Sequence, residues 1–312
     1  MDKPDPDWSH YRSFLAVLEE GSLSAAARAL GLTQPTLGRH IDELQYRLGL
    51  SLFTRSQSGL APTDAAIALR PHAEALKAAT AAIRRAASGV GTGIRGSVRI
   101  TASEVIGVEV LPPILRRLRE SYPDLEIELV LSNRVENLLR RDSDIAVRMV
   151  APSQDALIAK RIGDIHLGLF AHADYLERRA MPQRPADLVG HDLIGVDTIT
   201  PDVRSMLERL SGFADNIFHL RSDNHLAQLA MVRNGLGIGL CQIGLARRND
   251  RLVRVLADFS VPLDTWVTMH EDLRDSLRCR VVFDVLVAGM KEYWQESRSG
   301  LPAPDQKIVR HE

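Results

Sequence analysis

A glycine-rich stretch at residues 89–96 divides this chain of 312 residues into two parts of different character. Four of its eight residues are glycine, which favours neither helix nor strand, so the stretch predicts a hinge. Before it, apolar side chains follow helical spacing almost throughout. After it, strand-like and helix-like segments alternate. A chain of this length is also expected to form more than one compact domain.

The first 60 residues predict three short helices and a hairpin. Apolar spacing places the helices at Tyr11–Glu20, Ser24–Leu30 and Gln34–Leu48. Only Gly31-Leu32-Thr33 separates the second helix from the third, so these two helices meet across a tight turn. The stretch Phe53–Leu60 follows and is typical of a wing hairpin whose turn is supplied by Gly59.

The tight turn predicts a DNA-reading helix. Ser22 or Ser24 is expected to cap the second helix and Thr33 the third, while Pro35 suits the first helical turn. The exposed N-terminal face of the third helix carries Gln34, Thr36, Arg39 and His40. Such side chains contact base edges and phosphates in the major groove. Arg55 in the hairpin is the candidate for a phosphate or minor-groove contact; the alternative for each arginine is an ordinary solvated surface position.

An alanine-rich segment, residues 63–88, predicts a long helix with a second role. Its stripe positions alternate steps of four and three residues: Leu69, Ala73, Leu76, Thr80, Ile83 and Ala87. This is heptad spacing, which favours packing against a second copy of the chain. The alternative is a helix packed on its own domain. Pro71 is expected to bend or loosen the first turns.

Beyond the hinge the segments predict an α/β fold. Expected strands are Val98–Thr101, Ile127–Leu131, Asp144–Arg148, Leu167–Ala171, Leu193–Val196, Ile238–Gln242 and Trp266–His270. Expected helices are Val108–Tyr122, Val135–Arg141, Ser222–Asn234 and Arg278–Gln295. Such alternation implies parallel sheets covered by helices. The length suits two lobes, the first of about residues 97–165 and 266–296 and the second of about 166–265, followed by a loose tail at 297–312.

Several motifs in family order resemble one group of regulators. They are Ser22-x-x-x-Ala26-Ala27-x-x-Leu30, Thr33-Gln34-Pro35-Thr36-Leu37, Ile41-x-x-Leu44, Leu48-Gly49, Leu52-Phe53-x-Arg55 and Leu60-x-Pro62-Thr63. This pattern resembles the LysR-type transcriptional regulators. More loosely, Asp144–Arg148, Gly235–Gly239 and Trp266–Leu273 resemble the effector domain of the same family.

The resemblance implies a domain plan and a set of partners. A winged helix-turn-helix would occupy residues 1–62, a linker and dimerisation helix 63–88, a hinge 89–96, and a two-lobed α/β domain like periplasmic binding proteins 97–296. The partners implied are double-stranded promoter or operator DNA, a second copy in a homodimer that commonly assembles into a homotetramer, a small-molecule effector, and RNA polymerase. The effector is expected to close the lobes and change the angle between the DNA-binding arms.

Three residues depart from the family pattern. Gly38 stands where serine is usual in the recognition helix, Gln45 where glutamate is usual, and Ala66 where glycine is frequent. Gly38 lowers helix propensity and removes a hydroxyl, so it bears directly on base reading.

Candidate effector ligands follow from the ends of the predicted strands. In open α/β sheets, ligands bind at the C-terminal ends of strands and over helix N-termini. The polar residues expected there are Thr101, Ser103, Ser132, Asn133, Arg148 and Thr198. Hydroxyls at Thr101 and Ser103 can bind a carboxylate that Arg148 neutralises. The alternatives are helix capping for the two hydroxyls and an ion pair for Arg148.

Composition excludes several other classes of site. The two cysteines, Cys241 and Cys279, and the ten histidines lack metal-ligand spacing, so no metal and no cofactor is expected. Gly235–Gly239 follows a predicted helix and enters a strand, the reverse of a dinucleotide motif. No nucleophile motif of an enzyme is found, and we expect a protein that is not an enzyme.

Charge and hydropathy agree with this interpretation only weakly. Residues 1–96 carry 11 Lys and Arg against 9 Asp and Glu, a net charge of +2, and the remainder carries −3. No apolar run reaches the roughly 20 residues that a membrane span needs, and the acidic start lacks a signal-peptide pattern, so we expect a cytoplasmic location.

The rival classes are a small-molecule-binding or enzymatic α/β protein without sequence-specific DNA binding, and a winged-helix regulator that binds no ligand.

Overall fold

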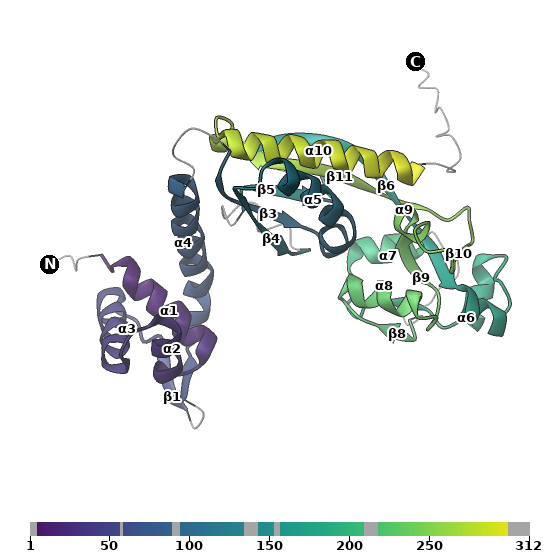
Figure 1. Ribbon diagram of the computed structural model, residues 1–312. Coiled ribbons are helices and arrows are strands. Elements are labelled where there is room, and N and C mark those ends of the chain that lie inside the picture. The colour runs from purple at the N-terminus through teal and green to yellow at the C-terminus, as the bar shows by residue number, and fades with distance from the viewer. Residues whose placement is uncertain are drawn as a thin grey trace, which may run out of the picture. The chain divides into compact units, whose positions relative to one another are not determined.

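The computed structural model describes residues 5–56, 59–88, 94–133, 143–152, 157–208 and 218–298. They belong to two compact units, the first within residues 5–88 and the second within residues 94–298 (Figure 1). Each unit is described by itself. The expected helix at Val135–Arg141, most of the hinge and the tail from residue 299 lie outside the described residues.

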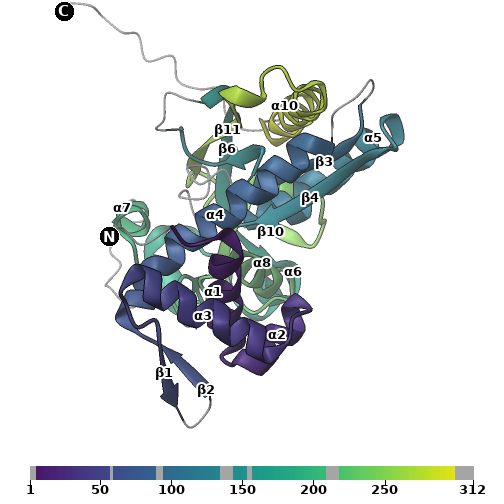
Figure 2. The same cartoon turned by 90° about the vertical axis from the view of Figure 1, so that its left-hand side faces the viewer.

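The first unit contains the three expected helices, a hairpin and a long helix (Figure 2). They are α1 (Trp8–Glu20), α2 (Leu23–Leu30), α3 (Gln34–Leu48), β1 (Phe53–Ser56), β2 (Gly59–Pro62) and α4 (Asp64–Ser88). The first helix begins three residues before the expected start because Asp7 caps it and accepts a hydrogen bond from the Ser9 amide. The short helices are thus bounded by side-chain caps that the sequence supplies.

A small apolar core holds the first unit together. Its fully buried members include Phe14, Leu37 and Leu44, one or two from each of α1 and α3, with Leu52 from the segment before the hairpin. Apolar positions at helical spacing therefore face a shared interior.

The long helix α4 divides its apolar stripe between two environments. Ala73 is buried, and Leu69 packs on the core of its own unit. Further along, Leu76 is 39% exposed and Ile83 69% exposed. The helix continues through Pro71 without a break. The alternative of packing on the same domain therefore holds for the first half of the stripe, while the second half is left uncovered within the described chain.

In the second unit, strands and helices alternate along the chain. Its elements are β3 (Gly96–Ala102), the π-helix η1 (Ile106–Val110), α5 (Leu111–Ser121), β4 (Leu125–Leu131), β5 (Ile145–Arg148) and the long strand β6 (Leu157–His172). The next elements are α6 (Ala173–Arg178), η3 (Pro185–Gly190), β7 (Ile194–Gly195), α7 (Pro201–Glu208), β8 (Leu220–Arg221) and α8 (His225–Arg233). The last are β9 (Gly239–Gln242), α9 (Ile243–Ala246), β10 (Leu252–Val255), β11 (Val261–His270), η4 (Glu271–Leu273) and α10 (Leu277–Arg298).

Among the described residues, seven strands form one mixed sheet. The order is β10-β6-β11-β5-β3-β4, and β9 also pairs with β6. Strand β3 is parallel to β4 and β5, as expected, but β11 is antiparallel to both β5 and β6. The short strands β7 and β8 form a separate parallel pair. The prediction of wholly parallel sheets is therefore corrected: an antiparallel ribbon crosses the unit.

That ribbon also crosses the predicted lobe boundary. Strands β6 and β11 pair from Val261 with Leu167 to His270 with Leu157, interrupted by a bulge between Thr265 and Trp266 (Figure 1). The bulge faces Gly163, whose φ is 143° and whose absent Cβ would lie 2.4 Å from the Trp294 ring. Only glycine fits there. Strands β6 and β11 are thus continuous across both of the predicted lobe boundaries.

Helices α5 and α10 cover one side of the β3–β5 region together. Gly289 of α10 allows this approach, because a Cβ there would lie 2.7 Å from the Ile114 side chain of α5. An ion pair between Arg117 and Glu292, 2.7 Å apart, joins the same helices at the surface. None of the described helices combines the length and the apolar character that crossing a bilayer requires.

Candidate functional site

The turn between α2 and α3 presents the start of α3 to solvent. Thr33 caps α3: its hydroxyl lies 3.3 Å from the Thr36 amide, which donates to it, and 2.8 Å from the Thr36 hydroxyl. Gln34 and Pro35 are exposed in the first turn. Ser22, rather than Ser24, caps α2 by accepting a hydrogen bond from the Ala25 amide. Exposed polar groups and N–H groups at a helix start suit phosphates and base edges.

Arg39 and His40, which are adjacent on α3, differ in their surroundings. Arg39 is exposed, and no side chain in the described part of the chain forms an ion pair with it. His40 Nδ1 lies 2.8 Å from the buried Ser13 hydroxyl of α1, and its ring meets that of His10 edge to face at 5.3 Å. Burial and the neighbouring His40 lower the pKa of His10. His40 therefore has a hydrogen-bond partner inside its own unit, which the spacing on α3 did not reveal.

The wing hairpin is tied to the turn before α2. Arg55 lies opposite Leu60 in the β1–β2 pair and is exposed. The Leu60 amide donates to the Gly21 carbonyl at 2.9 Å. Gly59 has φ 131°, and a Cβ on it would lie 2.6 Å from the same carbonyl oxygen. A glycine is thus required where the wing meets the helices.

Gln45 connects the end of α3 to the wing. Its Oε1 accepts hydrogen bonds from the Leu52 amide at 2.8 Å and from the Phe53 amide at 3.4 Å. A glutamate, the usual residue here, offers the same acceptor oxygens. In the sequence, Gln45 differs from the family pattern but shows no sign of this role, because its pairing with Leu52 depends on the folded loop between them.

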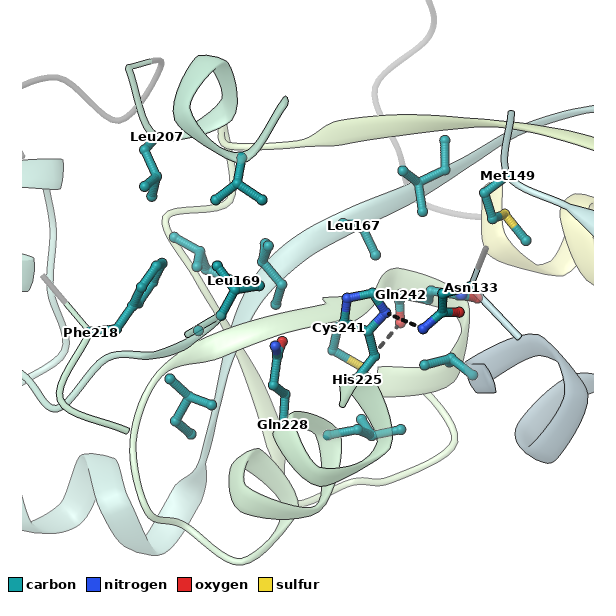
Figure 3. A pocket seen from close by; sticks show the side chains of 18 of the residues that line it. Asn133, Met149, Leu167, Leu169, Leu207, Phe218, His225, Gln228, Cys241 and Gln242 are labelled. Atoms are coloured by element: carbon teal, nitrogen blue, oxygen red, sulfur yellow. Dashed lines mark hydrogen bonds between the residues drawn. The ribbon is translucent and has the colours of Figure 1, made fainter. Parts of the chain in front are cut away.

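A cavity of about 360 Å³ lies within the second unit (Figure 3). Most of its lining is apolar. The lining residues are Ser103, Val105, Asn133, Arg148, Met149, Val150, Leu167, Leu169, Leu188, Leu193, Ile194, Gly195, Val196, Val203, Leu207, Phe218, His225, Gln228, Leu229, Ile238, Leu240, Cys241, Gln242, Phe259 and Leu263. In Figure 3, Asn133 and His225 lie toward one end and Leu207 and Phe218 toward the other. The cavity thus has a polar end and an apolar end.

Three of the six predicted ligand residues line this cavity: Ser103, Asn133 and Arg148. Thr101 does not; its hydroxyl accepts a hydrogen bond from the Arg148 guanidinium at 2.7 Å. Ser132 lies beyond the end of β4, and its amide donates to the Ala102 carbonyl. These two residues therefore support the lining at the ends of the strands and are not part of it.

Thr198 is directed elsewhere. Its hydroxyl donates to Asp223 Oδ2 at 2.8 Å and its amide to Asp223 Oδ1 at 3.0 Å. These hydrogen bonds lower the pKa of Asp223. Thr198 and Asp223 thus close the turn after β7, a pairing of residues 25 positions apart that strand order alone did not predict.

Arg148 has an unusual environment for a charged side chain. It is only 3% exposed. Its guanidinium donates hydrogen bonds to two neutral acceptors, the Thr101 hydroxyl and, at 3.2 Å, the Val147 carbonyl. In the described part of the chain, its Nε has no hydrogen-bond partner. Burial lowers the pKa of Arg148 to about 10, which leaves it charged at neutral pH. The alternative expected for Arg148, an ion pair with a protein carboxylate, is not found among the described residues.

Polar contacts join the two sides of the cavity. The carboxylate of Glu104, which follows β3, accepts hydrogen bonds from the Asn224 side chain and the His225 amide, both at 3.3 Å. Asn133 Nδ2 lies 3.4 Å from His225 Nδ1 (Figure 3). The start of α8 is thereby held against the ends of β3 and β4.

A stronger pair joins η1 to α8. Arg233 donates to both carboxylate oxygens of Glu109, at 2.7 and 2.8 Å. These hydrogen bonds lower the pKa of Glu109 and raise that of Arg233. Arg248 adds a hydrogen bond to the Glu109 carbonyl at 3.2 Å. Two-point pairing of this kind orients both side chains.

The cavity is lined by one thiol, that of Cys241. Cys241 is buried and free, and burial raises its pKa to about 12, so it stays protonated at neutral pH. Within the ranges that the structure describes, no three His, Cys, Asp or Glu side chains are grouped so as to hold a metal ion. Sequence reasoning did not single out Gln228 and Gln242 as lining residues, because only the fold brings them to the cavity.

Two family models match the chain. The LysR substrate binding domain matches residues 91–291, and the bacterial regulatory helix-turn-helix protein of the lysR family matches residues 8–67. An HTH-type transcriptional regulator of Xanthomonas campestris is 30% identical over 178 residues, which cover 57% of this chain and 52% of that relative. The probable HTH-type transcriptional regulator LtrA of Klebsiella pneumoniae is 26% identical, over 88% of this chain and 91% of its own.

Solved structures agree on the fold. CbnR, a LysR family transcriptional regulator, has a TM-score of 0.64 at 19% identity, with 93% of this chain and 99% of that chain covered. AphB of Vibrio cholerae has a TM-score of 0.60 at 23% identity, with 90% and 99% covered. The α/β alternative without a DNA-binding domain is not favoured, since the helix-turn-helix model covers α1 through the start of α4. The chain belongs to the LysR family of bacterial DNA-binding transcriptional regulators, with a helix-turn-helix domain followed by an effector-binding domain.

Proposed function

We propose that the start of α3 enters the major groove of promoter DNA and that the wing contacts the adjacent backbone. The observation that carries this proposal is that Gln34 and Arg39 are both exposed on α3, whose start is capped by Thr33, and that Arg39 has no ion-pair partner within the described residues. Gln34 suits adenine, and Arg39 suits guanine or phosphate. Arg55 extends the contact to a phosphate or the minor groove. His40 is left out of the base-reading set because Ser13 already binds it.

The hydroxyls of this face have a positioning role. Ser22 and Thr33 cap their helices, and Thr36 bonds to Thr33, so each hydroxyl already has a partner in the protein. Amides and hydroxyls at helix starts also contact phosphates without reading sequence. We therefore assign Ser22, Thr33, Pro35 and Thr36 to placement of α3 on the DNA backbone.

A titration of promoter DNA tests this assignment. The purified chain is titrated by fluorescence anisotropy onto its own upstream intergenic DNA and onto a scrambled sequence of the same composition, over a range of salt concentrations. We expect at least about 1,000-fold preference for the specific site. Affinity should also fall linearly with salt on logarithmic axes. Equal affinity for the specific and scrambled DNA would contradict the proposal.

The chain is proposed to act as a dimer through the second half of the α4 stripe. Leu76 and Ile83 are exposed there, and heptad spacing suits a second copy. Family membership supports further assembly into a tetramer and contact with RNA polymerase. Sedimentation of Ile83→Asp, with Arg84→Asp as the neighbouring control, tests the face: only the first substitution should shift the chain toward monomer.

In the second unit, the cavity is proposed to bind the effector and to transmit its presence to the DNA-binding unit. The domain plan is that of the sequence, with 1–62 binding DNA, 63–88 linking, 89–96 as hinge, and 97–296 as an effector domain of two lobes. The proposed activity is ligand binding and gene regulation without catalysis. The proposed location of the protein is the cytoplasm, where a regulator of bacterial genes acts. Identical DNA footprints and solution scattering with and without a saturating effector would contradict the coupling.

A further inference from the structure

The unpaired cation in the cavity wall is the most informative feature outside the DNA-binding face. Arg148 is the one side chain with a permanent charge among the described lining residues, and no carboxylate lines the cavity with it. Its bonds to Thr101 and Val147 use two neutral acceptors, and its Nε has none. A buried charge is costly unless an opposite charge meets it. Within the described residues, the protein supplies no such charge.

The remaining wall determines what else the ligand must be. Two further polar residues of the wall, Gln228 and Gln242, are already bonded within the protein. The rest of the wall is mainly leucine, isoleucine, valine and phenylalanine, with Leu207 and Phe218 at one end (Figure 3). A sugar or a short dicarboxylate would leave its own polar groups unpaired against these side chains. A volume of about 360 Å³ lies in the lower part of the range for small-molecule sites.

On the proposed function of this cavity as the effector site, we propose that the effector is an amphipathic monoanion. Its carboxylate lies against Arg148, and its hydrocarbon body extends along the apolar wall toward Leu207. One guanidinium balances one negative charge, which favours a carboxylate over a doubly charged phosphate. The carboxylate replaces the missing partner of Arg148 and gives the side chain the charged acceptor that it lacks.

The test uses matched ligands on the full-length protein. Isothermal titration calorimetry compares butanoate, hexanoate, octanoate and decanoate, with octan-1-ol and octanamide as uncharged partners and succinate as the polar comparator. We expect octanoate to bind at least about tenfold more tightly than the alcohol or amide. Affinity should rise about fourfold for each added methylene until the cavity is filled.

Substitutions then assign the two ends. Arg148→Met removes the charge while keeping an unbranched side chain, and it should make octanoate and octan-1-ol bind alike. Arg254→Met is the matched control, because Arg254 also has a buried, unpaired Nε but does not line this cavity. Leu207→Phe should shorten the preferred chain length. The wild-type ligand series stands by itself if a variant fails to fold.

Several outcomes would overturn the proposal. Equal binding of acid and alcohol to the wild type, unchanged octanoate affinity in Arg148→Met, no binding by any acid, or tighter binding of succinate each does so. A separate metabolite panel, read out by the DNA footprint, distinguishes the two levels. If a ligand of another class changes the footprint, only the chemical assignment fails; if no small molecule changes it, the proposed function fails as well.

Discussion

The proposed DNA-binding face and the cavity differ in how their glutamine and arginine side chains are surrounded. On the proposed DNA-binding face, Gln34, Arg39 and Arg55 are exposed. Around the cavity, Gln228 and Gln242 are each more than nine-tenths buried, and each is bonded within the protein, Gln228 to the Ser222 carbonyl and Gln242 to the Tyr293 hydroxyl. Exposed polar groups contribute little to the free energy of unfolding, whereas removing the partner of a buried polar group lowers it. Changes on the first face should therefore alter binding alone, and changes around the cavity should alter stability too.

The largest expected effect is on DNA affinity. Arg39→Ala and Arg55→Ala should each weaken binding to specific DNA by about 10- to 100-fold. The free energy of unfolding should stay within about 0.5 kcal/mol of the wild type, because both side chains are exposed. Anisotropy titrations and urea unfolding provide the two measurements.

Salt dependence distinguishes the two arginines, and Arg12→Ala, another exposed arginine of the same unit, is the control. Removal of a phosphate contact lowers the slope of affinity against salt by about 1 and weakens binding to all sequences alike. Removal of a base contact relaxes preference at one position. If Arg39→Ala and Arg55→Ala both bind as tightly as Arg12→Ala, the assigned face is wrong.

Beside the cavity, the expected effect is on stability and not on DNA affinity. Glu109→Gln weakens the two-point pair with Arg233 and leaves that guanidinium without its charged partner. The side chains are 22% and 33% exposed, so we expect a loss of about 2 kcal/mol in the unfolding free energy, between the values for surface and buried pairs. Glu120→Gln, which removes an exposed pair with Arg116, should change stability by less than about 0.5 kcal/mol.

The same pair predicts a pH dependence. The Arg233 hydrogen bond holds the pKa of Glu109 below the ordinary value of 4.5. A carboxyl whose pKa is lowered by folding stabilises the protein above its unfolded pKa, and that stabilisation is lost as pH falls through the folded pKa. Unfolding curves of wild type and Glu109→Gln should therefore differ at pH 7 and converge once the pH falls below the folded pKa of Glu109, which lies under 4.5. A difference that persists unchanged at low pH would exclude the ion pair as its source.

The two units also differ in how much of their structure the sequence predicts. In the first unit the signals are local: Ser22 and Thr33 lie within three residues of the amides that they cap. The helices and the two strands of the wing were predicted accordingly. Gly59, predicted to supply the turn, is the first residue of β2, and residues 57 and 58 lie outside the described residues. The Ser13–His40 contact was not, because it joins residues 27 positions apart on different helices.

In the second unit the decisive contacts are distant. The sequence predicted strands at Leu167–Ala171 and Trp266–His270, but their extension into β6 and β11 comes from their pairing with each other across about 100 residues. The short strands β8 and β10 and the helix α7 were not expected. The apolar end of the cavity combines side chains from several such segments, so its chemistry could not be derived from the local pattern around Thr101 or Arg148.

A smaller effect is expected at the link between α3 and the wing. Gln45→Leu should lower the unfolding free energy of the first unit by about 1 to 2 kcal/mol, because the amides of Leu52 and Phe53 lose their shared acceptor. Gln45→Glu keeps an acceptor oxygen and should retain the wild-type stability. Hydrogen exchange of the Leu52 and Phe53 amides measures the effect directly. Fast exchange in both variants would show that the amide side chain, and not only its oxygen, is required.

The smallest expected effect is a gain in stability at Gly38. A Cβ added there would meet only Leu23 Cδ1 at 4.0 Å, an ordinary contact, and the backbone is helical. Gly38→Ala should therefore stabilise the first unit by about 1 kcal/mol through helix propensity alone. Urea unfolding measures this gain, and titration of the promoter DNA measures its cost. If Gly38→Ala stabilises the unit yet weakens specific binding while Gly38→Ser restores it, a hydroxyl at this position can reach the DNA. If both variants lose specific affinity, the DNA approaches α3 so closely at residue 38 that only glycine fits.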